Sequence, residues 1–104
     1  MISDSTITLI RNFVNERDWG KYHKPGNLAK SVSIEAAELL ECFQWSDEPR
    51  DGDLEHVHEE IADVLIYSIM LADKLGFDLD EIIQDKMAKN AKKYPVESVT
   101  RSQD

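Results

Sequence analysis

The segment from His58 to Leu71 most constrains how this chain can fold, because it is apolar over helical length and still carries two carboxylates, Glu60 and Asp63. At about 100° per residue these acids share one helical face with Tyr67, while the other faces are apolar. A helix that is hydrophobic nearly all round is typical of a buried position. Because an ionised carboxylate is costly to bury without a partner, we expect Asp63 to be protonated or to face a cation.

Four segments show helical periodicity and none shows the alternation of a strand, so the sequence predicts an all-α fold. The predicted helices span Ser5–Arg17, Asn27–Trp45, Asp53–Gly76 and, last, Asp78 to just before Pro95. A chain of 104 residues has the size of one domain. We expect this domain to occupy residues 1–95, followed by a polar, aperiodic tail over residues 96–104.

Capping signals mark the starts of these helices. Asp4 or Ser5 is the predicted N-cap of the first helix, and Asn27 is that of the second. Asp78 and Glu81 have the spacing of a capping box, which predicts a well-defined start for the last helix.

Charge and cysteine content exclude several classes of protein. Acidic residues outnumber Lys and Arg by 21 to 12, giving a formal net charge of −9, whereas nucleic acids and anionic membranes bind basic surfaces. Cys42 is the only cysteine, which leaves no intrachain disulfide framework and no thiolate metal cage. The sequence has no leader pattern and no apolar run of about 18 residues. We therefore expect a cytoplasmic protein that binds neither a nucleic-acid polymer nor a membrane.

Two carboxylate pairs lie one helical turn apart on adjacent predicted helices, Glu35 with Glu38 and Glu60 with Asp63. A single pair of this kind is more often a solvated face, but two pairs can converge across a helix pair and then require a divalent cation. Oxygen ligands favour Mg²⁺ or Mn²⁺ over Zn²⁺, and protein-bound Mg²⁺ keeps positions open for phosphates and water. The pattern therefore indicates phosphate-ester chemistry.

Other patterns leave alternatives open. Glu55-x-x-His58 has the spacing of a di-iron motif, but the chain has no second copy, which disfavours that site. The loop before the second helix carries Trp19, Tyr22 and His23, which either cover the end of the bundle or stack on a planar ligand. The lysines that close the last helix either complement its dipole or grip a polyphosphate. They are Lys86, Lys89, Lys92 and Lys93.

The acid pairs, together with further blocks in the same order, resemble the MazG-like, all-α nucleotide pyrophosphohydrolases, in particular their dCTP-pyrophosphatase branch. The blocks are Arg17–His23, Asn27–Leu28, Glu38–Trp45, Glu59–Tyr67 and Lys86–Pro95. The resemblance implies cleavage of a nucleoside triphosphate, with dCTP or a modified dCTP as candidates, between its α and β phosphates. It also implies Mg²⁺ as the cofactor, with Mn²⁺ able to substitute, and a four-helix bundle completed in a homodimer or homotetramer.

The resemblance also implies roles for individual residues. The implied metal-binding and catalytic acids are Glu35, Glu38, Glu60 and Asp63, one glutamate also orienting the attacking water. The implied residues around base and sugar are Trp19, His23, Asn27 and Trp45, with Tyr67 beneath the deoxyribose. Lys86 and Asn90 are implied near the phosphates. The turn between Trp45 and Asp53 is shorter than in the resembling vertebrate enzymes, which leaves the base preference open. A phosphoribosyl nucleotide as substrate, or a non-enzymatic acidic interaction module, remain the alternatives.

Overall fold

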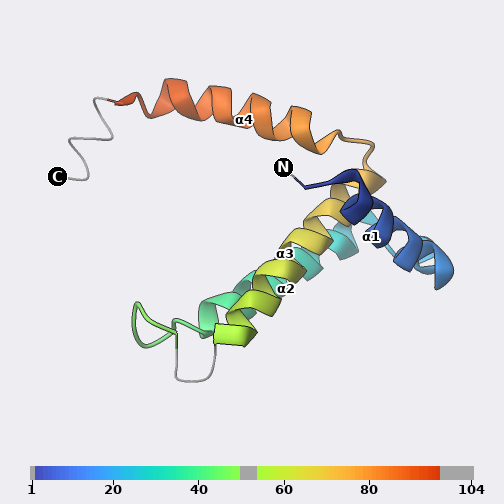
Figure 1. The fold of residues 1–104 in the computed structure, drawn as a ribbon, viewed down its shortest axis with the longest axis horizontal. Coiled ribbons are helices and arrows are strands. Elements are labelled where there is room, and N and C mark those ends of the chain that lie inside the picture. Colours follow the sequence, from blue (N-terminus) through green and yellow to red (C-terminus); the bar gives the residue numbers. More distant parts are fainter. Residues whose placement is uncertain (1, 50–53, 97–104) are drawn as a thin grey trace.

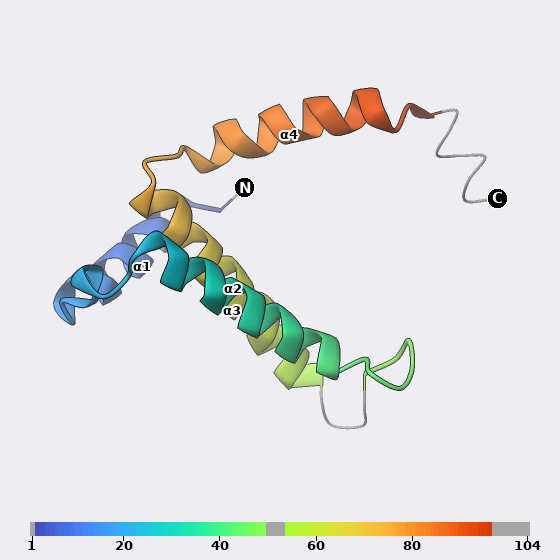
Figure 2. The ribbon, with the colours of Figure 1, turned by 180° about the vertical axis from the view of Figure 1, so that it is seen from behind.

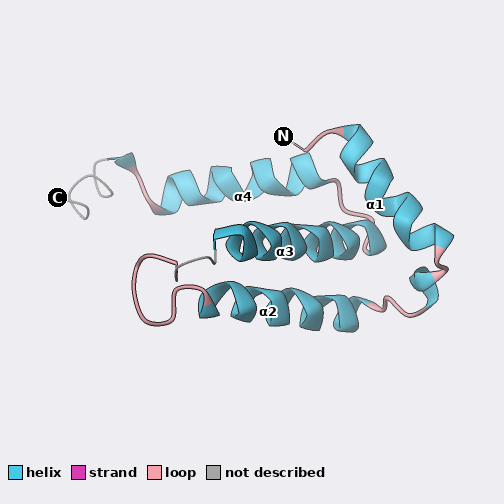
Figure 3. Ribbon diagram, turned by 60° about the horizontal axis from the view of Figure 1, so that its bottom comes forward, coloured by secondary structure: helices cyan, strands magenta, loops and turns pink. Residues whose placement is uncertain are grey.

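The computed structural model describes residues 2–49 and 54–96, and these residues form helices and connecting turns without a strand (Figure 3). The elements are α1 (Asp4–Glu16), the short 3₁₀ helix η1 (Trp19–Lys21), α2 (Pro25–Glu41), α3 (Leu54–Lys74) and α4 (Leu79–Lys93). The predicted all-α class is confirmed. None of the described helices combines the length and the apolar character needed to cross a bilayer.

The core of the chain is the seam between α2 and α3, which lie side by side and antiparallel (Figures 1 and 2). The residues buried along this seam are Leu28, Cys42, Val57, Glu60, Ile69 and Ala72. One of them is a glutamate, so the most extensive helix contact in the chain encloses a carboxylate.

α1 crosses the end of this pair near the last turn of α3, and it has no fully buried residue. An ion pair joins the two helices: Arg11 donates from both Nε and Nη2 to Asp73 Oδ1, at 3.0 and 2.6 Å. Where α1 runs into η1, the rings of Phe13 and Trp19 meet edge to face with centroids 5.3 Å apart. α1 is thus held by a few specific contacts rather than by a large apolar face.

A capped turn separates α3 from α4. Gly76 adopts φ 75°, which few other residues tolerate. Its N–H donates to the Asp73 carbonyl at 3.2 Å, and the Phe77 N–H donates to the Ala72 carbonyl at 2.9 Å, a Schellman arrangement that closes α3. Asp78 Oδ1 then accepts from the Glu81 N–H at 2.9 Å, which confirms the predicted N-cap of the last helix.

α4 extends away from α2 and α3 instead of packing on them (Figures 1 and 2). Its apolar positions Ile82, Ile83 and Met87 are 38%, 42% and 60% exposed. On α3, Ile61 and Leu65 are 46% and 48% exposed. The expectation that the Asp53–Gly76 helix is buried all round is therefore wrong for the described part of a single chain, in which α2 covers one side of α3 and α1 covers only its last turns.

Several predicted boundaries need correction. The N-cap of α1 is Ser3, whose Oγ accepts from the Thr6 N–H at 3.3 Å, and not Asp4 or Ser5. α2 begins at Pro25, because a proline fits the first helical position, where no backbone donor is needed. Asn27 therefore lies inside the helix and is not its N-cap.

The end of α2 also differs from the prediction. α2 ends at Glu41, and turns carry the chain through Trp45. α3 ends at Lys74, and the Schellman turn at Gly76 confirms the predicted end near this glycine. The predicted helix start at Asp53, residues 50–52 of the turn before it and residues 97–104 of the tail lie outside the described residues.

Candidate functional site

Three carboxylates meet across the seam between α2 and α3. Glu35 and Glu38 lie one turn apart on the same face of α2, and Glu60 faces them from α3. One oxygen of each lies within 4.8 Å of the others. Glu60 is only 5% exposed, whereas Glu35 and Glu38 are half-buried. We call these three residues the glutamate cluster.

Asp63, the fourth predicted acid, lies outside this close group. It sits one turn after Glu60 on α3 and is half-buried, so the buried acid of this helix is Glu60 and not Asp63. The charge of Asp63 makes a small contribution to the raised pKa of Glu35. Asp63 also lines the adjoining cavity described below, and so it connects the glutamate cluster to that cavity.

The glutamate cluster fits a divalent cation. Glu35 Oε2 and Glu60 Oε2 are buried and have no hydrogen-bond partner among the residues that the structure describes. Leaving a buried polar atom unpaired costs about 1–3 kcal/mol, and more for a charged group. The donor set consists of carboxylate oxygens, which suits Mg²⁺ or Mn²⁺. A bound cation would satisfy both oxygens and offset the repulsion within the cluster.

Crowding of the carboxyl groups raises two pKa values. The pKa of Glu35 lies above its ordinary 4.5, first because its carboxyl group can share a proton with the neighbouring Glu60 and then because of burial. The pKa of Glu38 is also raised, first by its hydrogen bond with Glu35 and then by the Glu35 charge. Such bonds need a proton between the two groups, so the metal-free cluster retains protons more strongly than separate glutamates would.

Mg²⁺ binding is therefore expected to weaken as the pH falls, beginning above the ordinary titration range of a glutamate. Metal and protons compete for Glu35 and Glu38. By the same linkage, protonation of this pair stabilises the metal-free fold at low pH, and that contribution is lost as the pH rises through the raised pKa values. Calorimetric titration from about pH 5 to pH 8, in buffers of different ionisation heat, measures affinity and released protons. An affinity independent of pH over this range would contradict the prediction.

His56 is a neighbour of the cluster that the sequence analysis did not single out. Its Nε2 lies 3.7 Å from Glu60 Oε1, one helical turn earlier on α3. The four-residue spacing between His56 and Glu60 was the available signal, but such spacings are common on solvated helix faces. The imidazole stands at the edge of the cluster and can orient the Glu60 carboxylate.

An aromatic cavity of about 410 Å³ adjoins Asp63. Its lining residues are Leu9, Ile10, Phe13, Trp19, His23, Asp63, Ile66, Tyr67 and Met70. The structure therefore brings together three of the predicted base and sugar residues, Trp19, His23 and Tyr67, and places them next to a predicted metal ligand. The Trp19 and His23 rings are 6.0 Å apart and inclined at 64°.

The sequence analysis did not foresee the contribution of α1 to this cavity. Phe13 belongs to an apolar stripe of α1, and an apolar stripe at helical spacing usually indicates core packing. In the structure, Phe13 contacts Trp19 edge to face, and the Arg17 guanidinium carbon lies 3.7 Å from the centre of the Phe13 ring. Phe13, Trp19 and His23 thus form a row of edge-to-face rings at one wall, and Arg17 covers the Phe13 ring.

Four predicted substrate residues do not reach this cavity in the single chain. Asn27 is exposed, and its side-chain amide donates to the Tyr22 carbonyl at 3.4 Å. Trp45 lies in the turn after α2 and is 79% exposed. Lys86, which is exposed, and Asn90, which is half-buried, lie on α4, which diverges from the α2–α3 pair.

The fold and the site define the class: an all-α protein whose antiparallel helix pair encloses a glutamate cluster beside an aromatic cavity. The model of the MazG-like family matches residues 30–103. The chain belongs to the MazG-like family.

Named relatives agree with this assignment. The chain is 37% identical to mouse dCTP pyrophosphatase 1 in an alignment of 91 positions, which covers 81% of this chain and 54% of that protein. It is 35% identical to the bovine dCTP pyrophosphatase 1 in an alignment of 105 positions, gaps included, which covers 90% of this chain and 62% of that one. The chain thus spans little more than half the length of these relatives. A crystal structure of a pyrophosphatase from Archaeoglobus fulgidus superimposes with a TM-score of 0.76 at 45% identity, covering 88% of this chain and 91% of that one.

Proposed function

We propose that this protein is a Mg²⁺-dependent pyrophosphohydrolase of (deoxy)nucleoside triphosphates, with dCTP or a modified dCTP as the favoured substrate. The observation that carries the proposal is the glutamate cluster, with two unpaired buried oxygens, next to an aromatic cavity large enough for a base. The relatives named dCTP pyrophosphatase and the archaeal pyrophosphatase support the same class of reaction.

The glutamate cluster has two proposed roles, metal binding and activation of the attacking water. Glu35, Glu38 and Glu60, with Asp63 at their edge, would hold Mg²⁺, which when bound supplies charge neutralisation on the phosphates. A glutamate of the cluster orients a water toward the α phosphorus and accepts its proton. As the new O–P bond forms, the bond from the α phosphorus to the bridging oxygen breaks, and pyrophosphate leaves.

The cavity supplies orientation for the nucleoside. Trp19 and His23 on one side and Tyr67 on the other present ring surfaces to a base and sugar. Stacking on such rings contributes about 1–3 kcal/mol per base. Because Asp63 lines the same cavity, a nucleoside held there with its sugar toward Asp63 would extend its phosphates to the glutamate cluster.

With dCTP and Mg²⁺, the expected products are dCMP and pyrophosphate, because the cluster lies next to the nucleoside cavity rather than remote from it. Phosphorus NMR of the reaction mixture distinguishes these products from dCDP and orthophosphate. Comparison with dUTP, dATP and a phosphoribosyl nucleotide in the same assay measures the substrate preference. A nucleoside diphosphate as the primary product would contradict the mechanism. Mg²⁺ binding without hydrolysis of any substrate would favour the acidic interaction module.

We also propose that a second copy of this chain covers α4. The apolar stripe Ile82, Ile83 and Met87 stays largely exposed among the residues that the structure describes, and the exposed Ile61 and Leu65 of α3 form a second apolar surface. The charges are complementary as well: α4 ends in lysines, whereas the α2–α3 pair carries the glutamate cluster. Docked on a second copy, α4 would bring Lys86 and Asn90 to the phosphate end of the partner copy's site.

Light scattering at micromolar concentration is expected to return at least twice the 11.9 kDa mass of one chain. Replacing Met87 and Ile83 by glutamine should shift the protein toward monomer, because the substitutions remove the apolar contact and leave the helix caps intact. An exposed substitution on the opposite helix end, Asp80→Asn, is the control. A wild-type mass equal to one chain would contradict the assembly.

A further inference from the structure

The two walls of the aromatic cavity are held together by little apolar packing. One wall comes from α1 and η1, and the other from α3. A second hollow of about 300 Å³ adjoins the cavity; it is lined by α1, η1 and α3 and by Leu28 of α2, and the two hollows share Ile10, His23 and Met70. Side chains that lie between two solvent-accessible hollows have fewer packing partners than side chains in a closed core. Contacts other than close apolar packing must therefore fix the distance between the two walls.

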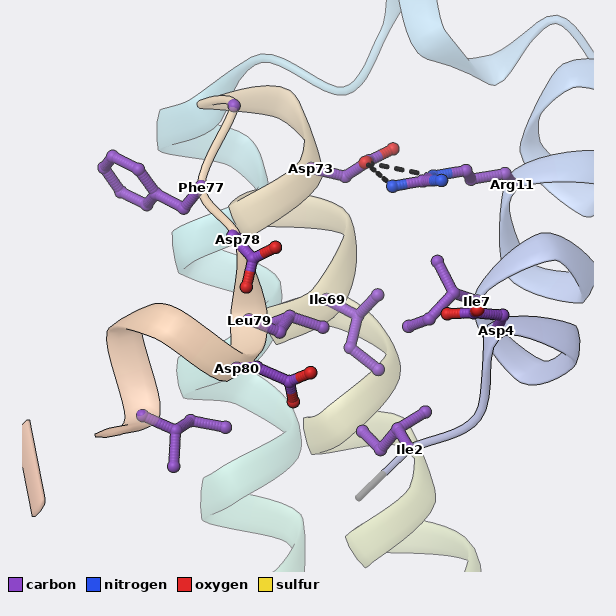
Figure 4. A pocket seen from close by; sticks show the side chains of 12 residues that line it. Ile2, Asp4, Ile7, Arg11, Ile69, Asp73, Phe77, Asp78, Leu79 and Asp80 are labelled. Carbon is purple, nitrogen blue, oxygen red and sulfur yellow. Dashed lines mark hydrogen bonds and ion pairs between the residues drawn. The ribbon is translucent and has the colours of Figure 1, made fainter. Parts of the chain in front are cut away.

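Two polar contacts bridge this poorly packed region, and both begin at the last turn of α3. Lys74 Nζ donates to the Gly20 carbonyl at 3.0 Å. The preceding residue, Asp73, accepts both hydrogen bonds from Arg11 of α1, as Figure 4 shows. Because the Schellman turn at Gly76 closes α3 directly afterwards, this last turn is a well-defined anchor.

Lys74 contacts the backbone of the segment that carries Trp19 and His23, the rings that line the cavity. Gly20 lies in η1 directly after Trp19, and its carbonyl also accepts from the His23 N–H at 3.3 Å. A lysine in the last turn of a helix often interacts only with the helix dipole, through the free carbonyl groups at the end of its own helix. Here the acceptor lies 54 residues away in the chain, on the opposite wall of the cavity.

We propose that Lys74 is a positioning residue: its ammonium group, through Gly20, holds Trp19 and His23 at the distance from α3 that a nucleoside requires. This inference rests on the proposed function of the aromatic cavity, but it concerns a residue that does not itself line that cavity. Lys74 thus acts on substrate affinity through η1 and takes no part in the chemistry at the glutamate cluster.

The test is a kinetic comparison of three variants. Lys74→Met, which keeps the length of the side chain but removes the donor, is expected to raise KM about five- to tenfold while kcat stays within about twofold, because only binding is lost. Lys74→Arg retains a donor and should restore a near wild-type KM. Lys30→Met removes the same charge from an exposed position of α2 and should leave KM unchanged.

A second measurement needs no substrate. In a Trp45→Phe background, used for fluorescence only, Trp19 is the remaining tryptophan. Lys74→Met is expected to make it more accessible to acrylamide, whereas Lys74→Arg and Lys30→Met should not. An unchanged KM in Lys74→Met, an equal KM rise in Lys30→Met, or unchanged quenching would overturn the proposal. If the wild-type protein hydrolyses no nucleotide, the proposed function fails, and the quenching comparison still decides the role of Lys74.

Discussion

Replacing Glu60 by glutamine is expected to abolish pyrophosphate release and, in EDTA, to raise the melting temperature. Glu60 is 5% exposed, one of its oxygens has no partner among the described residues, and two other glutamates lie close to it. In the metal-free fold its negative charge is therefore poorly solvated and repelled by the other two glutamates, an unfavourable arrangement that is common at functional sites. Glutamine keeps the shape and removes the charge. For a domain of about this size, each kcal/mol of relieved strain raises the melting temperature by roughly 4–8 °C.

The effect of Mg²⁺ provides the contrast. Added Mg²⁺ should stabilise the wild-type protein by about 2.7 kcal/mol at a hundredfold excess over Kd, and the Glu60→Gln variant much less. Glu59→Gln is the matched control, because Glu59 is the exposed neighbour on the same helix. Asp63→Asn should also be inactive, but with a smaller rise in melting temperature, because Asp63 is only half-buried. If the Glu60→Gln variant had a lower melting temperature than the wild-type protein both with and without Mg²⁺, the proposal of a metal site at this seam would be wrong.

Mixing two inactive variants is expected to restore activity. One variant, Glu60→Gln, loses the glutamate cluster, and the other, Lys86→Met, loses the α4 lysine. If α4 of each copy reaches the site of its partner, a mixed dimer has one site with both residues intact. Random mixing of equal amounts then gives about a quarter of the wild-type activity, because half of the dimers are mixed and each has one complete site.

A position of Lys86 in the site of its own chain predicts the opposite result. If Lys86 acted in the site of its own chain, every site in the mixed dimers would lack either the lysine or the glutamate, and no activity would return. Unfolding and refolding the mixture together allows the subunits to exchange, and each variant treated alone is the control. Absence of recovery, with mixed dimers demonstrated by mass spectrometry of a tagged copy, would contradict the exchanged position of α4.

Local patterns in the sequence predicted much of the fold. Apolar spacing placed four helices, and the capping box at Asp78 and Glu81 gave the start of α4 as observed. Three boundaries were missed: Ser3 caps α1, Pro25 starts α2 ahead of Asn27, and α2 ends at Glu41. Gly76 did mark the end of α3, which closes through a Schellman turn. Each of these signals acts within a few residues, which is why sequence alone can reveal them.

The acid spacing by itself determined which carboxylates share a helical face, since positions three residues apart are neighbours on any helix. Only the tertiary structure decided which of them is buried, because burial depends on what the facing helix presents: Glu60 lies in the seam, whereas Asp63 opens onto the cavity. The Lys74 contact with Gly20 and the divergence of α4 likewise join or separate residues far apart in the chain. Sequence periodicity describes one helix at a time, whereas the packing of the helices against each other determines which residues of different helices meet.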